Sequence, residues 1–179
     1  MSAWTNGAVA AVFAWAVLAA GAGWSQAEST NRVAAKTDWS VFVEENPKEC
    51  WGVSAPKSAV VRRGGEVDSS AQRGDILLFV TFRPGSGAAG EISYTGGYPF
   101  APDSTVEVQV AGQTYDLFTD GEWAWPATPE ADAEIVTALK AGAEATVVGR
   151  SSRGAVTTDQ FSLMGFTAAM DDAESRCAN

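Results

Sequence analysis

Hydrophobic and polar residues alternate with a period of two from Thr37 onward, a pattern typical of β-strands with one buried face. The first such segment has its apolar positions at Trp39, Val41 and Val43 and is followed by a turn at Asn46-Pro47. The second contains Cys50 and ends at Pro56. These two segments predict an opening β-hairpin.

The alternation recurs at regular spacing through the rest of the chain. Residues 74–82 are apolar on both faces, which is typical of a strand covered on both sides, so we expect this segment to be the central strand. Further strands are predicted at 91–94, 106–110, 114–118, 122–125, 145–150 and 156–163. Short strands at such spacing indicate a mainly β, antiparallel sandwich-like domain of about 8–10 strands, or a small closed sheet.

Two segments have the period of a helix instead. Thr128 is a suitable N-cap, Pro129 suits the first helical position, and Gly142 ends the pattern. The second helix has its apolar positions at Phe166, Met170, Ala173 and Cys177. We therefore expect two short α-helices, each with one buried stripe.

Three segments lack either period. Residues 1–27 have an apolar run of about 15 residues followed by Ser25-Gln26-Ala27, which predicts an export signal cleaved after Ala27. A retained anchor is the alternative, and the usual positive residues are missing, because the first basic residue is Arg32. We expect a flexible leader at 28–36 and a single domain at 37–179, in which residues 57–73 form a surface excursion.

Charge limits the classes of partner. The chain has 12 Lys and Arg residues against 22 Asp and Glu residues, a formal net charge of −10. Such a surface repels phosphate backbones and anionic lipid, so we expect no nucleic-acid partner. The mature chain has no segment apolar enough to predict a transmembrane helix.

The absence of histidine from the sequence excludes nucleophile systems that need an imidazole base and removes the commonest transition-metal ligand. The two cysteines, Cys50 and Cys177, are too far apart in the sequence for a zinc or redox motif. We expect a structural disulfide between them, formed in an oxidising compartment. Two free buried thiols are the alternative.

Four aromatic residues are the candidate partner-binding positions: Tyr98, Phe100, Trp123 and Trp125. The tryptophans share one face of a predicted strand and could stack on sugar rings or peptide side chains. Their alternation with Glu122 and Ala124 favours a place in the core instead. The loop with Tyr98 and Phe100 could form an exposed lip, although anchoring in the core is the favoured interpretation.

Paired carboxylates such as Asp120 and Glu122 would serve a glycan hydrolase if they faced one cleft about 5–10 Å apart. A turn explains this pair equally well, and no calcium, esterase or nucleotide-binding motif is present. We therefore expect no catalytic residue, no cofactor and no metal site. A carbohydrate- or peptidoglycan-binding module stays open as an alternative, and it requires the tryptophan pair to be exposed on a flat face.

Several short segments follow one another in a distinctive order: Asp38-Trp39-Ser40-Val41, residues 50–56, Gly96-Gly97-Tyr98-Pro99-Phe100, residues 121–125 and residues 161–166. Their order resembles the invasion-associated locus B family of alphaproteobacteria. The resemblance implies an exported, periplasmic or envelope-associated protein with a β-sandwich-like fold and a host-interaction role in pathogenic members. We expect the partner to be an envelope protein or a glycan. Cys50 and Cys177 resemble the family's cysteines near the start and the end.

Overall fold

The computed structural model describes residues 31–178, in which twelve strands form one antiparallel sheet. The strands follow one another across the sheet in the order β1-β2-β3-β6-β7-β10-β9-β8-β11-β12-β4-β5. Their bounds are β1 Arg32–Lys36, β2 Trp39–Glu45, β3 Lys48–Ser54, β4 Ser58–Arg63, β5 Glu66–Val67, β6 Leu77–Arg83, β7 Ala88–Thr95, β8 Thr105–Val110, β9 Gln113–Asp120, β10 Trp123–Trp125, β11 Glu144–Arg150 and β12 Val156–Ser162. The helices are α1 Pro129–Ala141 and α2 Phe166–Cys177.

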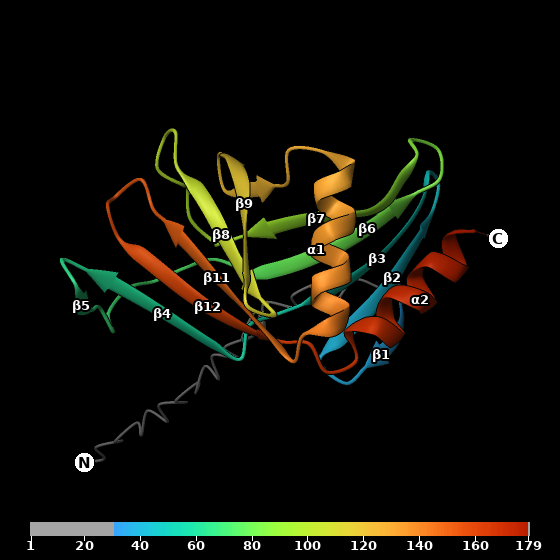
Figure 1. Cartoon of the computed structure of the whole chain (residues 1–179), viewed down its shortest axis with the longest axis horizontal. Helices are drawn as coiled ribbons and strands as arrows, with labels where there is room; N and C mark the ends of the chain where they lie inside the picture. The colour runs from blue at the N-terminus through green and yellow to red at the C-terminus, as the bar shows by residue number, and fades with distance from the viewer. Residues whose placement is uncertain (1–30, 179) are drawn as a thin grey trace, which may run out of the picture.

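The sheet curves strongly, and both helices lie on its inner side (Figure 1). The core is built from the inward residues of the strands and the apolar stripes of α1 and α2. Leu78, Val80, Ile92 and Leu117 are completely buried there. The prediction of a mainly β, antiparallel domain with two short helices is confirmed.

The arrangement differs from the predicted sandwich in one respect. The strands of residues 31–178 form one hydrogen-bonded ladder without a break, whereas a sandwich has two facing sheets. Alternation cannot distinguish these forms, because a strand buries one face in either of them. In this chain the curved sheet brings inner side chains of its own two halves together, as at Tyr94 and Phe161, and α1 and α2 cover the rest of the inner side (Figure 1).

The predicted leader and surface excursion are partly wrong. Residues 32–36 of the expected leader form β1, which pairs with β2 and has Lys36 opposite Trp39. The expected excursion at 57–73 contains β4 and β5, and β4 pairs with β12. These outer strands are mostly exposed and so lack a hydrophobic period. Residues 28–30 and the predicted signal at 1–27 lie outside the described residues.

α1 begins and ends where the sequence predicted, and α2 has the predicted buried stripe of Phe166, Met170, Ala173 and Cys177. Thr128 caps α1 by accepting a hydrogen bond from the backbone N–H of Ala131 at 3.3 Å. A carboxylate oxygen of Asp132 accepts the backbone N–H of Ile92 at 2.8 Å, which ties α1 to β7. Neither helix is long and apolar enough to cross a membrane.

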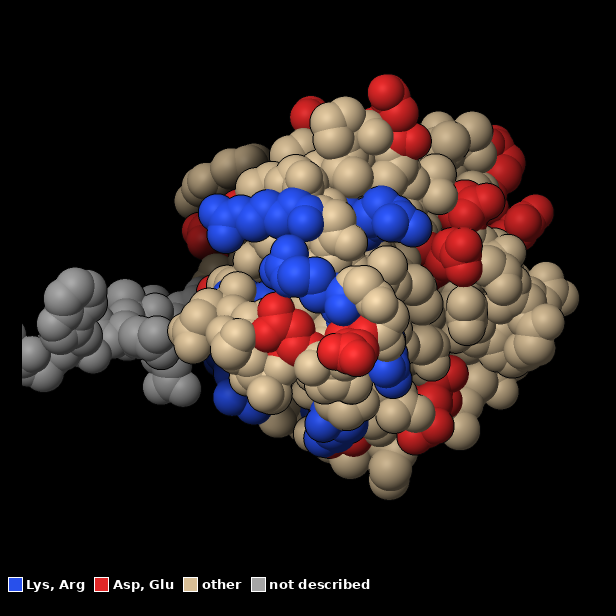
Figure 2. All heavy atoms as spheres, turned by 90° about the vertical axis from the view of Figure 1, so that its left-hand side faces the viewer, with Lys and Arg blue, Asp and Glu red and all other residues tan. Residues whose placement is uncertain are grey.

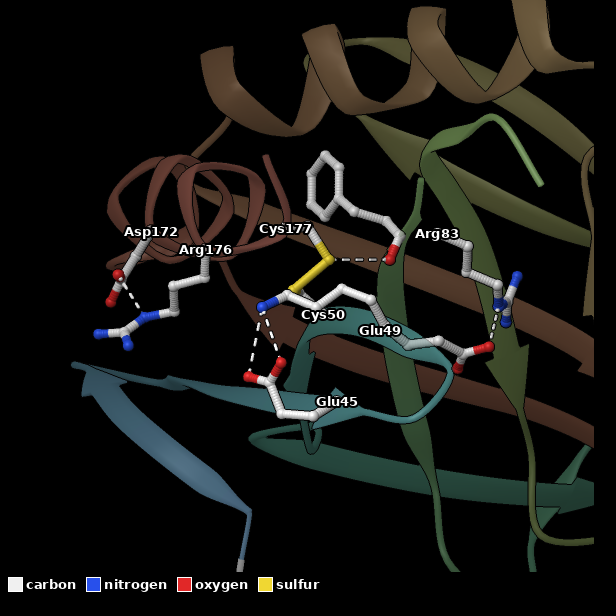
Figure 3. Close-up of a disulfide and its surroundings, with 9 residues drawn as sticks. Glu45, Glu49, Cys50, Arg83, Asp172, Arg176 and Cys177 are labelled. Atoms are coloured by element: carbon white, nitrogen blue, oxygen red, sulfur yellow. Dashed lines mark hydrogen bonds and ion pairs between the residues drawn. A yellow bond between two sulfur atoms is a disulfide. The ribbon is translucent and has the colours of Figure 1, made fainter. Parts of the chain in front are cut away.

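A disulfide joins Cys50 on β3 to Cys177 on α2, with an S–S distance of 2.16 Å, so the predicted bond is confirmed (Figure 3). Both cysteines are buried. Gly52 on the same strand gives α2 close access, because a Cβ atom there would lie 2.1 Å from the Met170 methyl group. The disulfide and this close packing hold the last helix against the first strands.

A buried ion pair connects the two halves of the sheet. Both terminal nitrogens of the Arg73 guanidinium donate hydrogen bonds to the carboxylate of Asp159 on β12, each at 2.6 Å. The Nε of Arg73 donates a hydrogen bond to the carbonyl of Gly96 at 2.8 Å. The Tyr94 hydroxyl on β7 also donates to Asp159. Burial and the negative charge of Asp159 raise the pKa of Tyr94, so this hydroxyl keeps its proton. Arg73 thereby links the segment before β6 to both β7 and β12.

Removal of the disulfide by Cys50→Ser and Cys177→Ser together should lower the free energy of unfolding by about 2–5 kcal/mol, because the bond closes a loop over a separation of 127 residues. Urea unfolding under oxidising conditions measures the loss. A reductant should shift the wild-type midpoint in the same direction and leave the double variant unchanged. An unchanged wild-type midpoint would contradict the prediction.

Replacement of Arg73 by Met should lower the free energy of unfolding by roughly 3–5 kcal/mol, because it leaves the Asp159 carboxylate buried without its cation. The double variant Arg73→Met with Asp159→Leu should recover much of the loss, since neither charge then remains. Arg63→Met is the matched control, because the Arg63 side chain in its pair with Asp68 is 52% exposed, and it should move the urea midpoint little. Equal effects of Arg73→Met and Arg63→Met would refute the role of burial.

Candidate functional site

The outer face of the sheet carries a row of large aromatic side chains. In β10, Ala124 is fully buried in the core, so its neighbours Trp123 and Trp125 point to the other side. Phe118 on β9 and Trp123 are 49% and 39% exposed. We define the aromatic belt as Phe42, Trp51, Phe79, Phe118, Trp123 and Trp125. A wet sheet face is normally polar, so this belt needs an explanation.

Strand register brings the rings of the belt together. Trp125 lies directly opposite Phe118 on β9, with ring centroids 5.5 Å apart. Trp123 and Trp125 have centroids 6.4 Å apart and planes within 21° of parallel, and the Phe79 ring lies 5.8 Å from Trp123. The belt therefore continues from β9 across β10 to β6.

The second part of the belt is the pair Phe42 and Trp51, on neighbouring strands β2 and β3. They are cross-strand partners, and their rings stack with centroids 5.5 Å apart and planes only 4° from parallel. From β9 to β2 the belt crosses five strand spacings of about 4.8 Å, or about 24 Å of sheet. This length suits an extended ligand better than a small molecule.

A shallow hollow of about 380 Å³ lies between the two parts of the belt. Trp51, Phe79, Trp123 and Trp125 line it together with the hydroxyl side chains of Thr81 and Ser93. Apolar rings beside a few polar groups are the usual composition of a binding site.

An ion triplet forms one border of this hollow. The Nε of Arg83 on β6 donates a hydrogen bond to Glu49 on β3 at 3.0 Å, and one of its terminal nitrogens donates to Glu91 on β7 at 2.7 Å. Figure 3 shows the Arg83 contact with Glu49. Hydrogen bonding to Glu91, with the charges of both carboxylates, raises the pKa of Arg83 although partial burial opposes this. The triplet carries a net charge of −1, because one arginine serves two carboxylates.

The structure places only two of the four candidate binding residues in the belt. Trp123 and Trp125 lie there, so the interpretation that placed them in the core is wrong. The two tryptophans do alternate with Ala124 as predicted, but Ala124 faces the core and the indoles face outward. Phe100 is buried, at 6% exposure, and cannot contact a partner. Tyr98 lies elsewhere, with its hydroxyl hydrogen-bonded to Thr157 on β12.

Tyr98 lines a separate cleft of about 490 Å³ that also involves Arg63, Arg73 and Arg153. Figure 2 looks onto this end of the molecule and shows basic side chains grouped around β4 and β5, with acidic ones between them. The Arg73 guanidinium lies 5.0 Å from the centre of the Tyr98 ring, a cation–π contact. Arg73 and Arg63 already pair with Asp159 and Asp68, so much of the cleft's positive charge is neutralised by the chain itself.

The carboxylate pair considered for a hydrolase does not share a cleft. Asp120 lies opposite Trp123 on the outer face of the sheet, whereas Glu122 lines the cleft near Tyr98. Both are exposed. Within residues 31–178 no three His, Cys, Asp or Glu side chains are grouped so that they could hold a metal ion.

Four residues of the belt were missed by sequence reasoning: Phe42, Trp51, Phe79 and Phe118. The available signal was the run from Gly74 to Phe82, which is apolar on both faces. Its outward residue Phe79 is half-buried by belt neighbours and not by a second protein layer. An apolar outer position on a central strand therefore marked the belt.

The outward indoles Trp51, Trp123 and Trp125 should account for most of the tryptophan fluorescence of the folded domain that acrylamide can quench, since Trp39 is only 1% exposed. Replacing Trp123 and Trp125 by Phe should lower the quenching constant of the remaining fluorescence, because the most exposed indole is then gone and the buried Trp39 contributes a larger share. Trp39→Phe is the matched control and should raise the average constant. Identical quenching in all three proteins would show that the indoles of β10 are not accessible in solution.

Comparison with known families gives one match. The family model described as Invasion associated locus B (IalB) protein matches residues 71–174, more than half of the chain. No curated protein and no solved structure matches. The matched region runs from just before Arg73 into α2, and so includes β10 and the Arg73–Asp159 pair. On this match, the chain belongs to the invasion-associated locus B family.

Proposed function

We propose that this protein is an exported, non-catalytic binding protein of the cell envelope and that the aromatic belt is its binding surface. The observation that carries the proposal is the exposure of Trp123 and Phe118 on the outer face of a sheet whose core lies on the other side. Aromatic side chains on a solvent-facing sheet cost solubility and are enriched at interfaces. A partner that covers them explains why they are there.

Export is supported by the disulfide and by the N-terminal sequence. Disulfides such as Cys50–Cys177 persist in oxidising compartments and are rare in the cytosol. The apolar run in residues 1–27, with small residues before the expected cleavage site, is typical of a signal peptide. Both observations favour a periplasmic or envelope-associated location.

A binding role is supported over a catalytic one by the placement of the acids. Asp120 and Glu122 line different surfaces, so this pair lacks the shared cleft that a two-carboxylate hydrolase needs. The belt instead offers what an interface needs, namely clustered indoles with polar groups around them. The proposed molecular act is therefore recognition of another envelope component.

An envelope crosslinking pull-down with tagged protein tests this proposal. Wild type should enrich a defined set of envelope components, identified by mass spectrometry, and Trp123→Ala with Trp125→Ala should reduce that enrichment by about fivefold or more, since such anchors dominate interface energy. Val67→Ala is the matched control, because Val67 is another exposed apolar residue, on β5 at 58% exposure. Osmotic-shock release of the tagged protein tests export in the same cells.

Equal enrichment by wild type and by the tryptophan double variant would show that the belt is not the binding surface. Retention of an uncleaved protein in the cytosol would contradict the proposed periplasmic or envelope-associated location.

A further inference from the structure

Three carboxylates lie beside the aromatic belt without an ion pair among the described residues: Glu107, Asp116 and Asp120. All three are exposed. Asp116 and Asp120 flank Phe118 on the outward face of β9, and Asp120 lies directly opposite Trp123. The exposed end of the belt is therefore bordered by negative charge.

Two of these carboxylates oppose each other. Glu107 on β8 and Asp116 on β9 are direct cross-strand partners on the same face. Like charges in directly opposite positions destabilise a sheet. The Glu107 carboxylate receives only a hydrogen bond from Gln109 at 3.3 Å, which leaves its charge in place. A cation between the two strands would remove this repulsion.

The chain itself supplies little positive charge here. Arg83 at the other end of the hollow is already shared by Glu49 and Glu91. Arg150 is an exposed basic residue on β11, two positions after Val148, which is the partner of Glu107. No ion pair joins Arg150 to a carboxylate of the described residues. The belt and its borders thus keep an excess of negative charge.

A hydroxyl group in the hollow also lacks a partner. Thr81 is only 6% exposed and lines the hollow, yet its side chain makes no hydrogen bond within residues 31–178. No side-chain oxygen or nitrogen of the described residues is both fully buried and unpaired, so the Thr81 hydroxyl opens toward the hollow. Because this oxygen is open to the hollow, solvent can reach it, and a bound ligand could replace that solvent as its hydrogen-bond partner.

We infer that the belt binds an extended, basic polypeptide segment of another envelope protein. Its arginine or lysine side chains lie over the rings of Trp123, Trp125 and Phe118, where cation–π attraction is strongest for tryptophan. The same cations pair with Asp116 and Asp120, and the backbone of the segment bonds the Thr81 hydroxyl. This inference rests on the proposed function, since it names the partner class of the same surface.

Charge decides against the other occupants. An anionic lipid surface or an acidic glycan would bring further negative charge to Asp116 and Asp120. A second copy docked through a twofold axis would bring two identical, negatively charged patches together, because such an interface uses the same surface of both molecules. A neutral glycan could stack on the indoles, but it would leave the repulsion between Glu107 and Asp116 in place. A basic polypeptide can stack cations on the aromatic rings, pair with the carboxylates and hydrogen-bond to the Thr81 hydroxyl at the same time.

Fluorescence anisotropy with the oxidised protein tests the inference. The probe is a labelled peptide of six Arg-Gly repeats, and the matched probe has citrulline in place of arginine, which keeps the planar shape and loses the charge. The arginine peptide should bind about tenfold or more tightly than the citrulline peptide. Its affinity should fall as salt rises from about 50 mM to about 500 mM, because counterions screen exposed charges.

Matched variants separate the belt from the net charge of the protein. Asp120→Asn and Trp123→Ala should each weaken binding of the arginine peptide about fivefold or more. Glu174→Gln makes the same change of charge as Asp120→Asn on the exposed side of α2, and should change binding less than about twofold. Circular dichroism and the urea midpoint show that each variant is folded.

Each outcome decides between the occupants. Equal weakening by Asp120→Asn and Glu174→Gln would mean diffuse attraction to a chain of net charge −10, and equal binding of the citrulline peptide would mean that charge is not recognised. Either result overturns the inference.

A hexamer of N-acetylglucosamine tests the glycan alternative. If the hexamer binds in a Trp123-dependent way and the arginine peptide does not, the belt is a glycan site. The proposed function then survives, and the inference of a basic partner fails. If the pull-down also shows no dependence on the belt, both fail.

Discussion

A sheet has two faces, and this chain supplies helices to cover only one of them. Nearly every feature depends on that constraint. The inner residues of the strands pack on α1 and α2, and the Cys50–Cys177 bond prevents α2 from leaving. The outer face must then be polar or covered by something else, and the row from Phe42 to Phe118 is far from polar. The proposed binding surface therefore lies on the face that the helices leave uncovered.

The curvature of the sheet creates a second constraint, because strands distant in sequence must be fixed against each other. Arg73 and Asp159 meet at such a point, between the segment before β6 and β12. A charge pair of this kind is worth little in net stability compared with apolar packing, but it tolerates only one geometry. The bidentate contact between Arg73 and Asp159, with the Tyr94 hydroxyl as a third member, fixes how the two halves of the sheet face one another.

Alternation in the sequence predicted most of the strands, and the helical period predicted both helices. The disulfide was predicted because the chain has only two cysteines. Alternation could not predict which face of β10 is buried. The order Trp123-Ala124-Trp125 has the same period either way, and the preference of large apolar residues for the core gave the wrong side. The strands β1, β4 and β5 were missed because a mostly exposed strand has no hydrophobic period to detect. The grouping of the belt depends on cross-strand register, which no local pattern contains.

The sheet is open, and the form of its two outermost strands limits how molecules can join it. An unprotected edge would offer backbone N–H and C=O groups to any passing strand and lead to aggregation. Here β5 is only two residues long, and β1 has a charged residue at each end, Arg32 and Lys36, the latter held in an ion pair with Asp172 on α2. Extension of the ladder by a foreign strand is therefore disfavoured at both ends. Recognition by this sheet therefore depends on the side chains of its outer face and not on backbone pairing at its edges.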